Sequence, residues 1–291
     1  MKLNILSASQ GYQWLRQANN IIQSNRVLFL GNTLLYIAAF IFVSFISLGS
    51  PVILASLIGI LSVIFSTTVM LICHRSLNPD VPEASMTLTQ LWVRAFKDKR
   101  ILILAFITTL SLTFLFLVSN IIANFLFPEL IQKNQEFLTN LENTDAQIST
   151  DLIVSAMPYY AMQQAFGIPA QIIAFLLFSM TPALIYWTNI SYGQAMFYNL
   201  IACLKNWRTW LAWFFAVFTI FAILPSAALA LLYVLTQAGL SALVLLATPI
   251  VFIFVIGLML LSMVIVPASY YFAYKDCFIQ NQQKPTEKQF Q

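Results

Sequence analysis

The stretch LTQLWVRAFKDKR, Leu88 to Arg100, lies between two runs of almost unbroken hydrophobic residues, and it decides the predicted fold. Its apolar residues recur at helical spacing on one face, and the basic residues point the other way. The apolar face comprises Leu88, Leu91, Trp92, Ala95 and Phe96. An amphipathic helix with a basic face is typical of a nucleic-acid contact, a partner contact or a membrane surface.

The composition of the whole chain favours the membrane. Of its 291 residues, 60% are hydrophobic and only 8% are charged, whereas a soluble domain carries roughly 25% charged residues. The mean hydropathy is +0.84. These values predict an integral membrane protein. The pI near 9.0 would suit nucleic acid, but its meaning depends on where the cations lie.

Six hydrophobic segments are long enough to cross a hydrocarbon core, which needs about 20 apolar residues per helix. They are Val27–Ser47, Val52–Cys73, Ile101–Phe125, Gly167–Trp187, Leu211–Thr236 and Ala247–Tyr271. The sequence therefore predicts an all-α fold with six transmembrane helices, forming one polytopic domain over residues 1–291.

The basic residues collect on one side of these six segments. Of the 14 lysines and arginines, Lys133 alone falls on the opposite side. The positive-inside rule makes the basic side cytoplasmic, so both termini and the polar tail 278–291 are predicted inside. The long loop 128–165 is predicted outside, and it carries the acidic residues Glu129, Glu136, Glu142, Asp145 and Asp151. The high pI thus reports topology, and no nucleic-acid partner is expected.

Three short segments that precede the first, third and fifth spans are predicted to be interfacial helices. Gln13–Arg16 and Leu91–Arg94 share the pattern Trp-x-Arg, and Ser191–Leu204 is the third segment. Such helices place apolar side chains in the headgroup boundary and cations against anionic lipid. We therefore predict headgroup or interface contacts on the cytoplasmic face for Trp14, Arg16, Arg26, Trp92, Arg94, Lys97, Lys99, Arg100, Lys205 and Arg208.

The spans also contain weak internal matches. Phe65–Thr68 in the second span resembles Phe178–Thr181 in the fourth, and Thr181–Ala183 resembles Val266–Ala268 in the sixth. These matches predict three tandem parallel repeats, each an interfacial helix followed by a hairpin, at about 8–75, 86–190 and 191–277. Similar apolar composition can produce the same matches without a repeat.

This order of Trp-containing helix, basic residue, hairpin and small-residue return end resembles a large group of bacterial six-span inner-membrane proteins of unknown function. That group is distantly similar to the membrane domain attached to some glycerophosphodiester phosphodiesterases. The resemblance covers most of the chain except Pro128 to Ala165. It implies the fold and a bacterial inner-membrane location, and it transfers no catalytic residue because no hydrolase domain is present.

Catalytic motifs are missing from the sequence. No charged residue lies in the middle of a predicted span, which weighs against an ion-coupled transporter. The chain has no phosphate-binding loop, His-Glu-x-x-His pair or nucleophile elbow, so we expect no enzyme, no catalytic residue and no cofactor. Cys73, His74, Cys203 and Cys277 fall near one membrane face. Their spacing lacks a close cysteine pair, so apolar packing is favoured over a metal site.

Polar residues and prolines within the spans leave two interpretations open. Asn120 and Asn124, one helical turn apart, either line a polar groove or hydrogen-bond to another helix, and we favour the second. Prolines in the last three spans either open a lateral cavity or let unequal helices pack. The leading functional hypothesis is an accessory or scaffolding component that organises lipid or a membrane or envelope partner. The alternative is a transporter or flippase-like protein for a lipid or amphipathic molecule.

Overall fold

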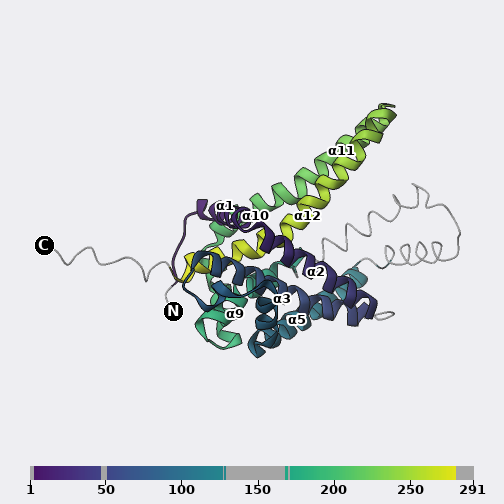
Figure 1. The fold of residues 1–291 in the computed structure, drawn as a ribbon. Coiled ribbons are helices and arrows are strands. Elements are labelled where there is room, and N and C mark those ends of the chain that lie inside the picture. Colours follow the sequence, from purple (N-terminus) through teal and green to yellow (C-terminus); the bar gives the residue numbers. More distant parts are fainter. Residues whose placement is uncertain (1–2, 47–50, 127, 129–167, 170, 280–291) are drawn as a thin grey trace.

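The computed structural model describes residues 3–46, 51–126, 128, 168–169 and 171–279. Throughout that part of the chain the regular secondary structure is helical, as Figure 1 shows. Six helical segments are long and apolar enough to cross a membrane, so the expectation of six such helices is confirmed. They are Arg26–Ile46, Ser56–Leu77, Lys99–Ser119, Gln171–Thr188, Trp207–Gln237 and Leu243–Phe278.

Twelve helical elements are assigned in the part of the chain that the structure describes. In chain order they are α1 (Ser9–Ser24), α2 (Arg26–Ile46), α3 (Pro51–Leu77), η1 (Pro82–Ser85), α4 (Leu88–Lys97), α5 (Lys99–Leu126), α8 (Thr181–Thr188), α9 (Tyr192–Lys205), α10 (Trp207–Phe218), η2 (Thr219–Ile223), α11 (Leu224–Gln237) and α12 (Ser241–Phe278). Residues 171–178 are also helical.

Three short helices run directly into helices that begin candidate membrane spans, and one residue with an amide or carboxylate side chain joins each pair. Asn25 lies between α1 and α2, Asp98 between α4 and α5, and Asn206 between α9 and α10. Each junction N–H donates to the carbonyl four residues earlier, and each junction carbonyl accepts from the N–H four residues later. The backbone therefore leaves helical geometry without leaving polar groups unpaired. These junctions fall within the three predicted repeat units, but the repeat itself stays a prediction.

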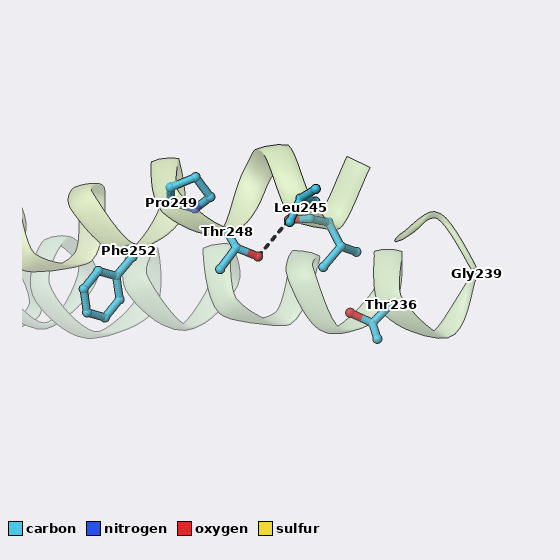
Figure 2. Close-up of a pocket in the computed structure, with 7 residues that line it drawn as sticks. Thr236, Gly239, Leu245, Thr248, Pro249 and Phe252 are labelled. Carbon is cyan, nitrogen blue, oxygen red and sulfur yellow. Dashed lines mark hydrogen bonds between the residues drawn. The ribbon is translucent and has the colours of Figure 1, made fainter. Parts of the chain in front are cut away.

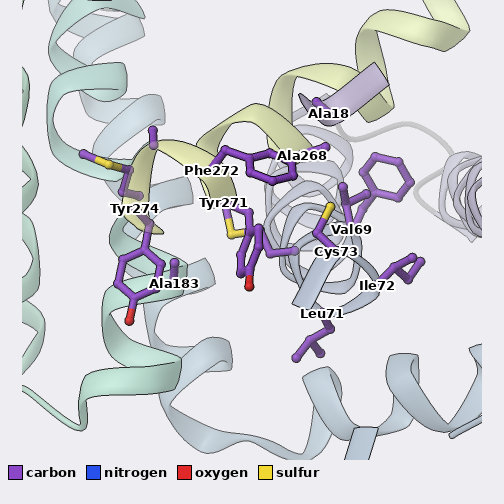
Figure 3. Close-up of a cluster of buried hydrophobic side chains, with 14 of the residues drawn as sticks. Ala18, Val69, Leu71, Ile72, Cys73, Ala183, Ala268, Tyr271, Phe272 and Tyr274 are labelled. Carbon is purple, nitrogen blue, oxygen red and sulfur yellow. The ribbon is translucent and has the colours of Figure 1, made fainter. Parts of the chain in front are cut away.

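The buried core lies at one end of the bundle, where α2, α5 and α10 begin and α3, α8 and α12 end. We call it the basic end, because Arg26, Arg75, Arg100 and Arg208 lie near these helix ends. Figure 3 shows part of this core, including Ala18, Val69, Cys73, Ala183, Ala268 and Phe272. Packing at the basic end thus fixes the helices to one another.

Away from this core, α11 and α12 form a hairpin that extends from the rest of the bundle (Figure 1). Its outward side chains are apolar and open: Leu245 is 78% exposed and Ile253 is 71% exposed. A groove of about 660 Å³ near the tip is lined mainly by apolar side chains, among them Leu245, Pro249 and Phe252 (Figure 2). A surface of this kind is stable when lipid or another protein covers it.

The fifth candidate span contains a π-helical turn just before its proline. In η2 the N–H of Leu224 donates to the carbonyl of Thr219, five residues earlier. Pro225 lacks an N–H, and its ring crowds the carbonyl four residues before it. The wider turn gives that ring room, so the helix continues from Trp207 to Gln237.

The fourth candidate span is interrupted at Ser179 and Met180, just before Pro182. An interruption leaves helical carbonyl and N–H groups that need other partners. Asn199, fully buried in α9, supplies both. Its Nδ2 donates to the carbonyl of Leu176 at 3.0 Å, and its Oδ1 accepts from the Met180 N–H at 3.2 Å.

The sixth helix is longer than predicted. The sequence indicated a span over Ala247–Tyr271, whereas α12 has 38 residues. At 1.5 Å per residue it is about 57 Å long, well beyond a hydrocarbon core of about 30 Å. Lys275 and Asp276 end the apolar run, but the helix continues because α1 packs against it. Residues 129–165 of the predicted outer loop and 280–291 of the tail lie outside the described residues.

Candidate membrane-interface site

The amphipathic stretch forms α4, and its apolar face points into the protein. Thr87 caps the first turn: its hydroxyl accepts from the Gln90 N–H, and Gln90 Oε1 accepts from the Thr87 N–H. Leu91 and Ala95 are fully buried. The cap and the buried stripe together fix the orientation of the helix, so that its basic side lies at the surface.

Trp14 and Trp92 lie in the core, whereas the sequence analysis placed both at the lipid interface. Trp92 Nε1 donates to Asn32 Oδ1 at 2.7 Å, and Trp14 Nε1 donates to Asp276 Oδ2 at 2.9 Å. Trp92 is 8% exposed and Trp14 is 0% exposed. This corrects the prediction for the two indoles. An amphipathic pattern shows that a helix has an apolar face, but it does not distinguish lipid from protein as the neighbour of that face.

Arg94 is held by a carboxylate and a phenol. One guanidinium nitrogen lies 2.7 Å from Glu83 Oε1, and Nε donates to the hydroxyl of Tyr186. Glu83 is buried, yet the Arg94 side chain remains 37% exposed. The cluster joins η1 and α4 to α8, and it fixes a cation that still reaches the surface.

Arg100 makes a second connection to α8. Its guanidinium donates to Asn189 Oδ1 at 2.9 Å and to the carbonyl of Ile185 at 3.3 Å. Asn189 has a φ of 53° at the end of α8, a left-handed conformation that asparagine tolerates. Arg100 also lies 2.9 Å from Asp98 Oδ2. Burial alone raises the pKa of Asp98, but hydrogen bonds from Arg100 outweigh burial and hold that pKa below its ordinary value.

A groove of about 760 Å³ lies between η1 and α4; we call it the α4 groove. Its polar lining comprises Ser85, Gln90, Arg94, Lys97 and Asp98. Pro82, Met86 and Val93 supply apolar walls. The groove therefore combines two cations and one carboxylate with apolar surface, and its excess of positive charge suits an amphipathic anion better than a neutral polar ligand.

The other predicted interface cations lie on the surface: Arg16, Arg26, Lys97, Lys99, Lys205 and Arg208. Trp207 is not among the predicted interface residues, yet it is 56% exposed, and the Arg208 guanidinium lies 5.4 Å from its ring centre. An exposed Trp-Arg pair at the start of a span is typical of a membrane interface, so adjacency to the fifth span could have found it.

Buried polar residues near the basic end were also missed. Asn206 Oδ1 accepts from the Leu6 N–H at 2.8 Å, and its Nδ2 donates to the carbonyl of Asn4 at 3.1 Å. Asn32, Asn199 and Asp276 are likewise buried with hydrogen-bond partners. Their partners lie far away in the sequence, so spacing gives little signal for them.

The three cysteines are buried in the core, where Cys277 Sγ also accepts from Asn206 Nδ2 at 3.7 Å. Cys73, Cys203 and Cys277 are buried free thiols, and burial raises the pKa of Cys203 to about 12. His74 Nδ1 lies 3.0 Å from the Tyr271 hydroxyl. Within the described ranges, no three His, Cys, Asp or Glu residues are grouped so as to hold a metal ion.

Asn120 and Asn124 belong to α5, but their side chains lie outside what the structure describes. Whether they line a groove or bond to another helix stays a prediction. Comparisons with protein-family models, with curated proteins and with solved structures give no match for this chain.

Proposed function

We propose that this chain is a non-enzymatic component of a bacterial inner membrane that organises lipid or a membrane partner, with its basic end in the cytoplasm. The observation that carries the proposal is the contrast between a packed basic end and long helices with exposed apolar faces. Leu245 and Ile253 on α12 illustrate those faces. Monomeric soluble proteins rarely expose contiguous apolar patches larger than a few hundred Å².

The charges at the basic end support its proposed cytoplasmic location. Exposed lysines and arginines lie beside the starts of α2, α5 and α10. Cations in such positions are attracted to anionic lipid and favour retention on the cytoplasmic side. The exposed Trp207 beside Arg208 suits the same boundary, because an indole combines an apolar body with a polar N–H.

Spin-label accessibility tests the membrane placement. The native cysteines are buried, so labels attach to introduced cysteines with little background. A label at Ile253→Cys on α12, where the native side chain is 71% exposed, should relax with oxygen, which concentrates in lipid, and not with a water-soluble nickel chelate. A label at the exposed Asp80→Cys in the loop after α3 should show the reverse. Collision of the Ile253→Cys label with the nickel chelate in lipid vesicles would contradict the proposal.

A transporter or flippase-like function is the second candidate. The interrupted fourth span favours it, because discontinuous helices form substrate sites in many transporters. Against it, Asn199 already satisfies the backbone groups that the interruption frees. Reconstituted protein should leave the transbilayer movement of a fluorescent phospholipid at the rate of protein-free vesicles. A rate increase proportional to the protein content would favour the transporter instead.

A further inference from the structure

The α4 groove has the charge and shape of a site for one anionic headgroup. Lys97 is exposed on its wall, and Arg94 presents a guanidinium that Glu83 and Tyr186 hold in place. Two guanidinium nitrogens are engaged with Glu83 and Tyr186, and the third lies 3.8 Å from the weak acceptor Met86 Sδ. That third nitrogen is the donor that a phosphate oxygen would take over. Gln90 carries a further donor nitrogen on a side chain whose oxygen is already bonded to the Thr87 N–H.

The charge around the groove is positive despite two carboxylates. Both carboxylates are engaged, Glu83 with Arg94 and Asp98 with Arg100. Lys97 and Lys99 are exposed at the same helix junction and add positive charge that these pairs do not cancel. The net field therefore attracts an anion, and the lysines carry most of the attraction.

An apolar path leads away from this charge along α5. Lys99, Ile103, Phe106 and Leu110 follow helical spacing on one face. The exposed fractions of the last three are 46%, 61% and 59%. This face begins at Lys99, one residue after Asp98 in the groove lining, and a soluble phosphate ester has no acyl chain to contact it.

We propose that the α4 groove binds the phosphate of an anionic glycerophospholipid whose acyl chains lie along α5. The inference rests on the proposed membrane function, and it assigns the lipid class and the binding position. Phosphatidylglycerol fits because its headgroup keeps a net negative charge. Phosphatidylcholine fits less well because its choline cation would face Lys97.

Native mass spectrometry of the full-length protein in detergent tests the site. Phosphatidylglycerol and phosphatidylcholine with the same acyl chains are titrated against wild type, Lys97→Gln and Lys205→Gln. Lys205 is an exposed cation on α9, so its variant removes the same charge outside the groove. Lys97→Gln should weaken phosphatidylglycerol binding by roughly fivefold, from the attraction expected per basic residue. Lys205→Gln should weaken that binding less than Lys97→Gln does, because Lys205 is an interface cation that lies outside the α4 groove.

The remaining outcomes each decide against the proposal. Equal losses of phosphatidylglycerol binding in both variants would mean that the positive charge acts without a defined site. Unchanged binding in both variants would mean that Lys97 does not contact the lipid. Displacement of the lipid by glycerol 3-phosphate, or binding of that ester alone, would assign the groove to a soluble phosphate. Lipid binding is measured in detergent, so it can fail while the spin-label result for membrane placement still holds.

Discussion

The indole nitrogen of Trp14 donates a 2.9 Å hydrogen bond to the buried carboxylate of Asp276, so α1 is bonded to α12. Gln10 donates to the same oxygen, and the Asn4 N–H donates to the carbonyl of Cys277 at 2.9 Å. A buried carboxylate requires such donors, because an unpaired buried charge costs several kcal/mol. These hydrogen bonds therefore join α1 and the preceding Asn4 to α12 at the basic end of the bundle.

Replacing Trp14 by Phe should destabilise the protein by about 1–3 kcal/mol, because one donor to the buried carboxylate is lost. Tyr12→Phe is the matched control, since Tyr12 lies on the same helix and is 60% exposed. The free energy of unfolding in mixed micelles, titrated with a denaturing detergent, measures both. Equal stability of the two variants would mean that the bond to Asp276 contributes nothing.

Gly11→Ala should separate α1 from α10. A Cβ at Gly11 would lie 2.1 Å from the carbonyl oxygen of Thr209 and 2.8 Å from the Trp213 nitrogen. Both neighbours are backbone atoms, so relief requires helix movement, at a cost of about 1–3 kcal/mol. Gly193→Ala in α9 meets open space and should be neutral or stabilising by up to about 1 kcal/mol. Thermal unfolding measures the melting temperature of each variant. Equal melting temperatures for Gly11→Ala and Gly193→Ala would contradict the close contact between α1 and α10.

Asn199→Ala tests whether the side-chain hydrogen bonds of Asn199 stabilise the interrupted fourth span. It leaves the Leu176 carbonyl and the Met180 N–H without their side-chain partner, which should cost about 1–3 kcal/mol for each unpaired group. Asn20→Ala, at an exposed position on α1, should change stability by less than about 0.5 kcal/mol. Proteolysis in detergent offers a second measurement, because a loosened break exposes residues near Ser179 to cleavage. Unchanged stability would show that the break needs no partner.

Asp98 should contribute a pH-dependent stability at the α4–α5 junction. Its pKa is lower in the folded protein than its ordinary value near 3.8, because the hydrogen bonds from Arg100 outweigh burial. A depressed folded pKa gives stability that is present above the unfolded pKa and is lost as the pH falls through the folded pKa. The melting temperatures of wild type and Asp98→Asn should therefore differ at pH 6 and converge below about pH 3.8. A melting-temperature difference that stays constant over that pH range would mean that the negative charge of Asp98 does not stabilise the protein.

The long helices could be predicted because their sequence signal is local. Runs of about 20 apolar residues suffice to identify a span, and the first, second and fifth predicted segments agree with the structure to within four residues at either end. The sixth fails at its C-terminal end because Tyr274 and Cys277 are buried by packing that hydropathy does not register.

The side of each short helix that meets the protein could not be predicted. Leu91 and Trp92 have the same periodicity whether their neighbour is an acyl chain or a buried asparagine. Hydrogen bonds such as that from Trp92 to Asn32 join residues 60 positions apart, and a single sequence contains no signal for that pairing. The exposed cations were easier to place, because an unpaired charge is costly to bury.

The orientation of the basic end is the central claim, and labelling of single cysteines in spheroplasts tests it most directly. Gln237→Cys lies at the tip of the α11–α12 hairpin, and Asp80→Cys lies in the loop between α3 and α4; both positions are exposed. An impermeant thiol reagent should label Gln237→Cys in intact spheroplasts and should label Asp80→Cys only after the membrane is permeabilised. Labelling of Asp80→Cys from outside, with Gln237→Cys protected, would contradict the proposed cytoplasmic location of the basic end.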